Sequence, residues 1–237
     1  MKINVVTIFP EVMDAILNMG MLGVAKKKAL VEYDIVNPRD FTGDVHRTVD
    51  DEPYGGGGGM VMMVPPIVDA VERLEVPEGS PVILLSPAGK RFDQTMARRF
   101  AGESELTFIC GRYKGVDQRV CDIVVTEEVS IGDFILSGGE LAAGACIESV
   151  IRLLDEVLQN KESRETDSFE ERRAHLLDCA YYTRPADYRG RRVPDVLLSG
   201  NHKDIEDWRK ESSLQRTRQM RPDLLKRKDQ ESQGGHK

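Results

Sequence analysis

The fold is decided by residues 105–158, ELTFICGRYKGVDQRVCDIVVTEEVSIGDFILSGGELAAGACIESVIRLLDEVL. Two short apolar runs in it, Leu106–Cys110 and Ile123–Val125, predict buried strands. A loop that mixes glycine with polar residues follows each run, and the apolar stripe from Gly138 to Leu158 predicts a long helix. Open α/β sheets bind ligands beside the carboxyl ends of their strands. The stretch therefore predicts an α/β fold with a ligand site at the strand ends.

Glycines are clustered in these loops. Glycine lets the backbone approach a ligand closely and adopt positive φ, so that backbone N–H and C=O groups can contact the ligand. A single glycine is more simply explained as the end of a strand or a turn, whereas three glycine-containing loops in one segment favour a binding site. The glycines concerned are Gly111, Gly115, Gly132, Gly138 and Gly139.

The first hundred residues show the same alternation of strands and helices. The predicted elements are a strand at Ile3–Phe9, helical segments from Pro10 and at Gly23–Leu30, a strand at Val31–Val36, a helix at Pro65–Leu74, a strand at Pro81–Ser86 and a helix at Asp93–Phe100. A strand, a helix and a second strand in that order place the two strands in parallel. We therefore expect a parallel sheet in which three consecutive strands deliver loops to one edge.

Residues 37–59 interrupt this pattern with a long irregular segment, which inside a compact domain is usually functional or disordered. His46, Arg47 and the acids 50–52 could form a catalytic or metal-binding cluster, or simply solvated polar surface. The five glycines 55–59 lack the Lys-Ser/Thr of a phosphate-binding P-loop. We interpret them as a mobile lid over an active site.

Composition separates an acidic body from a basic tail. The net charge of −7 divides into −10 for residues 1–160 and +3 for residues 161–237. Such asymmetry fits a ligand-binding body with an arm for a polyanion, although a solvated helical tail explains it equally well.

The sequence shows no secretory leader and no apolar stretch that could span a bilayer, and its four cysteines match no zinc or redox motif. We expect a cytoplasmic protein with reduced thiols and no membrane partner.

Three domain segments are predicted: a ligand-binding body at 1–160, a flexible linker at 161–175 and a small helical domain at 176–237. The linker has no apolar periodicity, and short amphipathic helices are predicted at Asp204–Gln219 and Arg221–Lys228.

On the long helix predicted before the linker, Arg152 lies four residues from both Glu148 and Glu156. This spacing predicts an exposed ladder of ion pairs as the simplest role of Arg152.

Several longer strings are much more specific. They are HRTVDDEPYGGG at 46–57, LSPAG at 85–89, CGRYKGVDQR at 110–119, EEVSIGDFILSGGELAA at 127–143, DSF at 167–169, LLDCAYYTRPADYRG at 176–190, VPDVLLSGNHKDI at 193–205 and SLQRTRQMRPDLL at 213–225. Together, and in this order, they make nearly the whole chain resemble the TrmD family of bacterial tRNA (guanine-N1-)-methyltransferases, which belongs to the SPOUT superfamily.

The resemblance implies more than the patterns do. It implies an α/β parallel-sheet body with a deep trefoil knot that binds S-adenosylmethionine, followed by a flexible linker and a small C-terminal helical domain that binds tRNA. It also implies a homodimer in which both subunits build each active site. The reaction implied is methylation, at N1, of the guanosine immediately 3′ of the anticodon.

The resemblance also assigns site residues. It implies that Asp167 is the general base and that Arg152 stabilises the purine O6. The residues it assigns to the S-adenosylmethionine site are Pro87, Gly111, Tyr113, Gly115, Ile131, Gly132, Asp133, Phe134, Ile135, Leu136, Gly138 and Gly139. No metal ligand is assigned, and a Mg²⁺ requirement stays open.

The basic C-terminal segment fits a tRNA-binding role. Its arginines can contact phosphates, namely Arg184, Arg189, Arg191, Arg192, Arg209, Arg216 and Arg218. Tyr181, Tyr182 and Tyr188 could stack on bases of the anticodon loop or pack inside the domain.

The chain departs from the family pattern at a few positions. Lys114 stands where the family usually has Glu, which reverses a charge beside the donor pocket, and Gly58 replaces a proline in the glycine loop. The Pro-Gly that commonly breaks the long helix is also missing, so we expect that helix to run further. Two alternatives therefore stay open: a non-catalytic RNA-binding protein with an impaired donor site, and another RNA methyltransferase of the SPOUT type.

Overall fold

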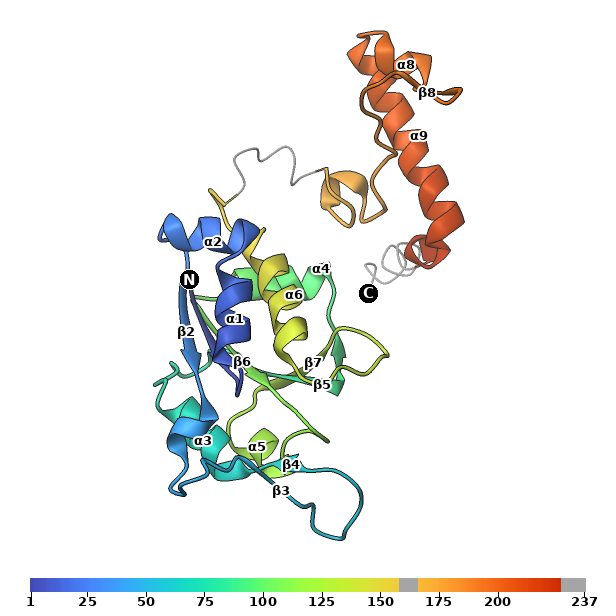
Figure 1. The fold of residues 1–237 in the computed structure, drawn as a ribbon. Coiled ribbons are helices and arrows are strands. Elements are labelled where there is room, and N and C mark those ends of the chain that lie inside the picture. The colour runs from blue at the N-terminus through green and yellow to red at the C-terminus, as the bar shows by residue number, and fades with distance from the viewer. Residues whose placement is uncertain (158–165, 227–237) are drawn as a thin grey trace, which may run out of the picture. The chain divides into compact units, whose positions relative to one another are not determined.

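The computed structural model describes residues 1–157 and 166–226, and the chain divides into two compact units with the boundary after residue 158 (Figure 1). The first unit is built on a five-stranded sheet with the order β2-β1-β6-β5-β7 and every pairing parallel. Its strands are β1 (Lys2–Val6), β2 (Glu32–Val36), β5 (Val82–Arg91), β6 (Glu105–Cys110) and β7 (Glu127–Ser130). The predicted α/β fold with a parallel sheet is confirmed.

Helices cover both faces of this sheet, as Figure 1 shows. On one face lie α1 (Pro10–Leu17), α2 (Gly20–Lys27), α4 (Gln94–Ala101) and α6 (Glu140–Ile151), and on the other lie α3 (Val64–Glu72), α5 (Gln118–Ile123) and the 3₁₀ helix η1 (Pro38–Phe41). Residues 42–63 form an irregular excursion with one short antiparallel pair, β3 (Asp50–Asp51) and β4 (Val61–Met62). The sheet is therefore the middle of three layers.

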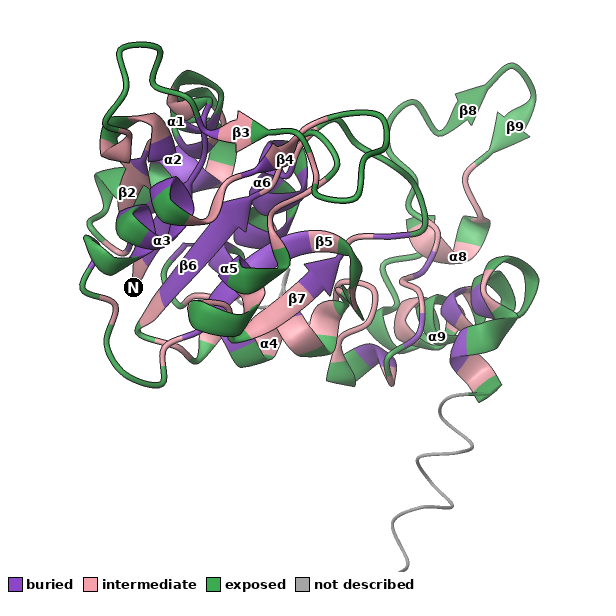
Figure 2. Cartoon of the chain, turned by 90° about the horizontal axis from the view of Figure 1, so that it is seen from below, coloured by how far each residue is buried: buried purple, intermediate pink, exposed green. Residues whose placement is uncertain are grey.

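The core follows the period-2 geometry of the strands. On β6, Leu106, Phe108 and Cys110 belong to the hydrophobic cluster under α1 and α6, whereas Ile109 belongs to the cluster under α3. Successive side chains on a strand point to opposite faces, so a strand covered on both sides must be apolar at nearly every position. Figure 2 shows β6, in the middle of the sheet, as largely buried, whereas the edge strand β2 is mostly intermediate or exposed.

Two of the strand predictions need correction. Ile123–Val125 is not a strand: Ile123 ends α5 and is 57% exposed, Val124 N–H donates to the Val120 carbonyl, and the strand itself is β7. Three apolar residues are too few to distinguish a strand from the end of a helix. The loop predicted after Ser86 is a bulge inside β5. Leu85 and Lys90 both pair with Val129 of β7, so the four residues between them, 86–89, bulge out of the strand.

The helix predicted to run to Leu158 is also too long. α6 ends at Ile151, with Arg152 as its C-cap, and Glu156 has a φ of 69°. The N–H groups of Leu153 and Leu154 bond three residues back rather than four, which tightens the last turn and stops the helix. Glu156 therefore lies outside the helix and cannot extend the ladder predicted for Arg152, while Leu158 lies outside the described residues.

The second unit contains the 3₁₀ helix η2 (Glu171–Arg173), the hairpin of β8 (Asp187–Tyr188) and β9 (Arg191–Arg192), and the helices α8 (Asp195–Leu198) and α9 (His202–Met220). α9 confirms the helix predicted at Asp204–Gln219. Residues 166–175 of the predicted linker form hydrogen-bonded turns, whereas residues 161–165 and the end of the helix predicted at Arg221–Lys228 lie outside the described residues. The linker's flexibility stays a prediction.

The described part of the chain, residues 1–157 and 166–226, contains no helix long and apolar enough to cross a bilayer. All four cysteines are free thiols, and Cys121 is the one that is only partly buried. Burial raises the pKa of Cys146 to about 12, so that this thiol stays protonated at neutral pH.

Phe108 tests the position of the core. Its side chain is fully buried and meets Phe100 edge to face, with 6.4 Å between the ring centroids. We expect Phe108→Ala to lower the free energy of unfolding by about 3–5 kcal/mol, because the cavity cannot fill. Urea unfolding followed by circular dichroism measures this. Val45→Ala, at a position that is 95% exposed, is the control and should change it by less than about 0.5 kcal/mol. A loss below about 1 kcal/mol for Phe108→Ala would contradict the assignment.

Candidate functional site

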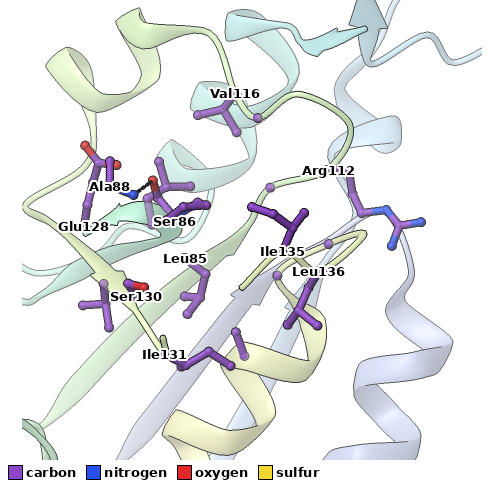
Figure 3. A pocket seen from close by; sticks show the side chains of 18 of the residues that line it. Leu85, Ser86, Ala88, Arg112, Val116, Glu128, Ser130, Ile131, Ile135 and Leu136 are labelled. Carbon is purple, nitrogen blue, oxygen red and sulfur yellow. Dashed lines mark hydrogen bonds between the residues drawn. The ribbon is translucent and has the colours of Figure 1, made fainter. Parts of the chain in front are cut away.

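A pocket of about 550 Å³ lies between the bulge of β5 and the ends of β6 and β7. Most of its lining comes from residues 84–88, 111–116 and, without Asp133, 128–139, and Figure 3 shows Leu85, Ile131 and Leu136 around the same cavity. Eleven of the twelve residues predicted for the donor site line this pocket: Pro87, Gly111, Tyr113, Gly115, Ile131, Gly132, Phe134, Ile135, Leu136, Gly138 and Gly139. The structure thus brings the predicted loops together, while the binding role of each residue stays a prediction.

Asp133 is the exception. It does not line the pocket; its side chain is 95% exposed, and its carboxylate lies 3.8 Å from the Arg91 guanidinium. Its neighbours Gly132 and Phe134 face the cavity instead, and a Cβ on Gly132 would lie 2.7 Å from the Phe134 ring. Within residues 131–139, Asp133 is therefore the one residue that the backbone turns away from the cavity.

Glycine is required where the pocket loops touch the sheet. A Cβ on Gly139 would lie 2.8 Å from the Cα of Cys110, closer than such atoms approach, and the Gly139 N–H donates to the Gly111 carbonyl at 3.0 Å. Gly115 has a φ of 124°, which other residues rarely adopt. These two glycines let the N-terminus of α6 and the loop after β6 close on one cavity.

A buried carboxylate ties the pocket loops to β1, and the sequence patterns did not reveal it. Glu140, 5% exposed, accepts a hydrogen bond from the Thr7 hydroxyl at 2.8 Å, and its other oxygen lies 3.7 Å from the Arg112 guanidinium. Arg112 in turn lies over the Phe9 ring at 4.5 Å. Because Glu140 is the first residue of α6, its side chain joins the start of this helix to the end of β1 and to the loop after β6.

Burial, together with the same carboxylate, keeps a neighbouring thiol unreactive. Burial, and then the charge of Glu140, raises the pKa of Cys110 well above its usual value. Cys110 therefore serves as a small apolar side chain beneath the pocket rather than as a nucleophile.

The glycine loop 55–59 is fastened to the pocket at its C-terminal end. The Lys114 N–H donates to the Met60 carbonyl at 3.0 Å, and the Met62 N–H donates to the Gly115 carbonyl at 3.0 Å. A Cβ on Gly59 would lie 3.0 Å from Cγ of Lys114, so the lysine stem packs on this glycine. The loop is thus positioned next to the pocket, and its role as a lid stays a prediction.

The cluster predicted around His46 does not form a metal site. Arg47 pairs with Asp40, and Asp44 organises the turn by accepting bonds from Thr48. Within residues 1–157 and 166–226, no three His, Cys, Asp or Glu side chains are grouped so that they could hold a metal ion.

The two residues predicted to be catalytic do not line the pocket. Arg152 is exposed at the C-terminal end of α6, thirteen residues after Gly139. At 1.5 Å of rise per residue, the helix separates the two positions by roughly 20 Å. Asp167 belongs to the second unit, where it is partly buried and its carbonyl accepts from the Glu170 N–H at 3.4 Å.

The second unit displays arginine and tyrosine side chains at its surface. All seven predicted phosphate-binding arginines are exposed, and Tyr181, Tyr182 and Tyr188 are each more than half exposed. The alternative in which these tyrosines pack inside the domain is therefore wrong. Tyr182 contacts Trp208 with 6.1 Å between ring centroids, and Arg189 lies 5.2 Å over the Tyr188 ring, so two of the three rings are already oriented.

Comparison with known proteins gives one consistent result. The family model described as tRNA (Guanine-1)-methyltransferase TrmD matches residues 1–227. Proteins named tRNA (guanine-N(1)-)-methyltransferase are similar over nearly their full length. The one from Nostoc punctiforme is 50% identical over 235 residues, covering 99% of this chain and 97% of that protein. The one from Listeria welshimeri is 51% identical, covering 95% and 92%, and the one from Hahella chejuensis is 51% identical, covering 95% and 87%.

Asp117 gives a pH-dependent test of the loop after β6. It caps α5, and its hydrogen bonds from the Arg119 side chain and backbone lower the pKa of the carboxyl to about 2. A depressed pKa stabilises the fold above the unfolded-state value near 4, and this contribution is lost as the pH falls from about 4 to about 2.

We expect Asp117→Asn to lower the free energy of unfolding at pH 7 by at most about 1 kcal/mol, since its partner Arg119 is exposed and the ion pair is screened by solvent. Urea unfolding from pH 7 to pH 2 should show the two proteins converging at the acid end. A difference that stays constant, or grows, as the pH falls would contradict this role.

Proposed function

The chain belongs to the tRNA (guanine-1)-methyltransferase family, and we propose that it moves the methyl group of S-adenosylmethionine to N1 of the guanosine immediately 3′ of the tRNA anticodon. That it is a tRNA (guanine-N1)-methyltransferase rests on the match over residues 1–227 and on half-identical relatives over almost the whole chain. The donor, the target nucleotide and the roles of individual residues are the parts that we propose.

The pocket fits S-adenosylmethionine in size and chemistry. Its volume of about 550 Å³ lies within the range of roughly 300–1,000 Å³ for small-molecule sites. Leu85, Ile131 and Leu136 offer apolar contact for a purine, while the backbone of the glycine loops offers hydrogen bonds to its polar edge. When bound, the donor would supply an activated methyl group on a positively charged sulfur, which leaves readily.

Chemistry at guanine N1 requires that a proton be removed as the methyl group arrives. We assign the carboxylate of Asp167 to accept that proton, while the N1 lone pair forms the new C–N bond and the electrons of the broken C–S bond return to sulfur. A positioned general base contributes on the order of 10²–10⁴-fold. Negative charge that develops on the purine O6 is assigned to the guanidinium of Arg152.

The separation of Arg152 from Gly139 along α6 supports a site shared between two copies of the chain. Helix α6 holds Gly139 and Arg152 roughly 20 Å apart. A purine base is much smaller than this distance, so Arg152 and the pocket of the same subunit would not both contact one guanine. Apolar side chains are also exposed on α1 and α6, where Val12 is 42% and Leu141 63% exposed. Exposed apolar side chains on these two neighbouring helices fit an association surface, and we propose a homodimer.

The second unit is assigned to tRNA. Its exposed arginines can contact phosphates, which makes the affinity depend on salt, and its exposed tyrosines can stack on unpaired bases. The deep trefoil knot of the first unit is part of the same proposal, supported by membership of the family. We also propose a cytoplasmic location.

Gly139 tests whether the pocket binds the donor. We expect Gly139→Ala to weaken S-adenosylmethionine binding at least roughly tenfold, because the added Cβ forces the loop away from Cys110. Isothermal titration calorimetry measures this. Gly58→Ala is the control, since nothing lies within 4 Å of a Cβ there and its φ is not positive. Unchanged affinity in Gly139→Ala would place the donor elsewhere. If the unsubstituted protein binds no donor, the alternative of an RNA-binding protein with an impaired site gains support.

Asp167 tests the proposed base. We expect Asp167→Asn to slow methyl transfer to unmodified tRNA by about 10²–10⁴-fold while donor affinity stays within a few-fold, because the amide cannot accept the proton. A single-turnover assay with labelled donor and calorimetry measure the two quantities. Near-normal turnover would remove Asp167 from the mechanism.

A further inference from the structure

Arg173 is a buried charge that the proposed reaction leaves unexplained. It ends η2 and is 7% exposed, which is unusual for arginine in a unit this small. Its Nε lies 3.1 Å from the carboxylate of Asp178 and donates to the carbonyl of Thr166 at 3.3 Å. Its Nη1 lies 3.7 Å from the carboxylate of Glu206 on α9. One guanidinium therefore joins three separate segments of the second unit.

Two of these contacts fix the residues around Asp167. The carbonyl that Arg173 holds belongs to Thr166, immediately before Asp167. The residue immediately after, Ser168, accepts a hydrogen bond through its hydroxyl from the Asp178 N–H at 2.9 Å. The peptide that carries Asp167 is thus held on both sides by the same pair, Arg173 and Asp178.

The third contact links this peptide to α9. Besides the Glu206 pair, the Leu177 N–H donates to the Thr217 hydroxyl at 3.1 Å, and the Ala180 N–H donates to the Ser212 hydroxyl at 3.0 Å. The exposed side of α9 carries three of the seven arginines assigned to tRNA, namely Arg209, Arg216 and Arg218. The helix that would contact tRNA and the turn that carries Asp167 are therefore one connected piece.

From this geometry we propose that Arg173 is a positioning residue for methyl transfer: it ties the peptide carrying Asp167 to α9, so that the helix bound to tRNA sets the place of the carboxylate. The inference rests on the proposed role of Asp167 as general base. Burying an ion pair contributes little net stability compared with an apolar replacement, so geometry is the better reason for its presence. The planar guanidinium directs Nε toward Thr166 and Asp178 and Nη1 toward Glu206 at a fixed angle, which the compact ammonium of lysine does not reproduce.

Two substitutions test this, with one control. Arg173→Lys keeps the buried charge and removes the fork, and Glu206→Gln loosens the link to α9 at a side chain that is 40% exposed. Glu211→Gln makes the same charge change at an exposed position of the same helix and is the control. The readouts are the single-turnover rate at saturating donor and tRNA, the tRNA dissociation constant and the melting temperature. If Arg173→Lys does not fold, Glu206→Gln decides the question.

We expect Arg173→Lys to lower the single-turnover rate by roughly 10–100-fold, the range in which misplacement of about 1 Å acts, with tRNA and donor affinities nearly unchanged. Glu206→Gln should lower the rate in the same direction by a smaller factor, and Glu211→Gln should leave it unchanged. A purely structural role would instead lower the melting temperature and tRNA affinity while the single-turnover rate of the bound complex stays normal, and that result would overturn the inference.

Combining the substitutions with Asp167→Asn separates the inference from the function on which it rests. If Arg173 acts through Asp167, then Arg173→Lys in the Asp167→Asn background slows the residual reaction no further. Multiplied losses would show that Arg173 acts independently and would overturn the positioning role while leaving Asp167 as the base. Near-normal turnover by Asp167→Asn alone would overturn both.

Discussion

The close approach of α6 to the end of β6 is the constraint on which the pocket depends. Gly139 packs where a Cβ would collide with the backbone of Cys110, so the helix can begin directly against the strand. Because the helix begins there, its first residue, Glu140, points into the protein and reaches Thr7 and Arg112. The loops after β6 and β7 are then held around one cavity, and the bulge of β5 closes the third side.

Each unit uses one buried charged side chain to hold segments that are distant in sequence. Glu140 joins the end of β1 to the loop after β6, and Arg173 joins the turn around Asp167 to α9. Burying a charge is costly unless its partners are well placed, so such residues stabilise one geometry more than they stabilise the fold. In a methyltransferase, where catalysis depends largely on placement of the reacting atoms, this use of buried charge fits the chemistry.

Much of the body could be predicted because its signals are local. β1 and β6 place apolar residues on both faces of the sheet, as strands covered on both sides do, and the clustered glycines indicated the pocket. Local signals failed in two places. The apolar run Ile123–Val125 is too short to distinguish a strand from the end of a helix. After Ile151, α6 ends in a tightened turn and not at a helix-breaking residue, so the sequence gives no sign of the end. Glu140 contacts Thr7, a residue far away in the sequence, and Arg173 lies in a segment without apolar periodicity. Neither set of contacts could therefore be predicted from a local sequence pattern.

We propose that backbone groups at the bulge of β5 and at the tips of β6 and β7 hold the methyl donor. Amide hydrogen exchange with and without S-adenosylmethionine tests it most directly, because exchange reports on those N–H groups themselves. We expect exchange to become slower on donor binding in residues 111–116 and 131–139, and to stay unchanged in residues 166–180 while tRNA is absent. Unchanged exchange in both pocket loops at saturating donor, or protection confined to the second unit, would contradict it.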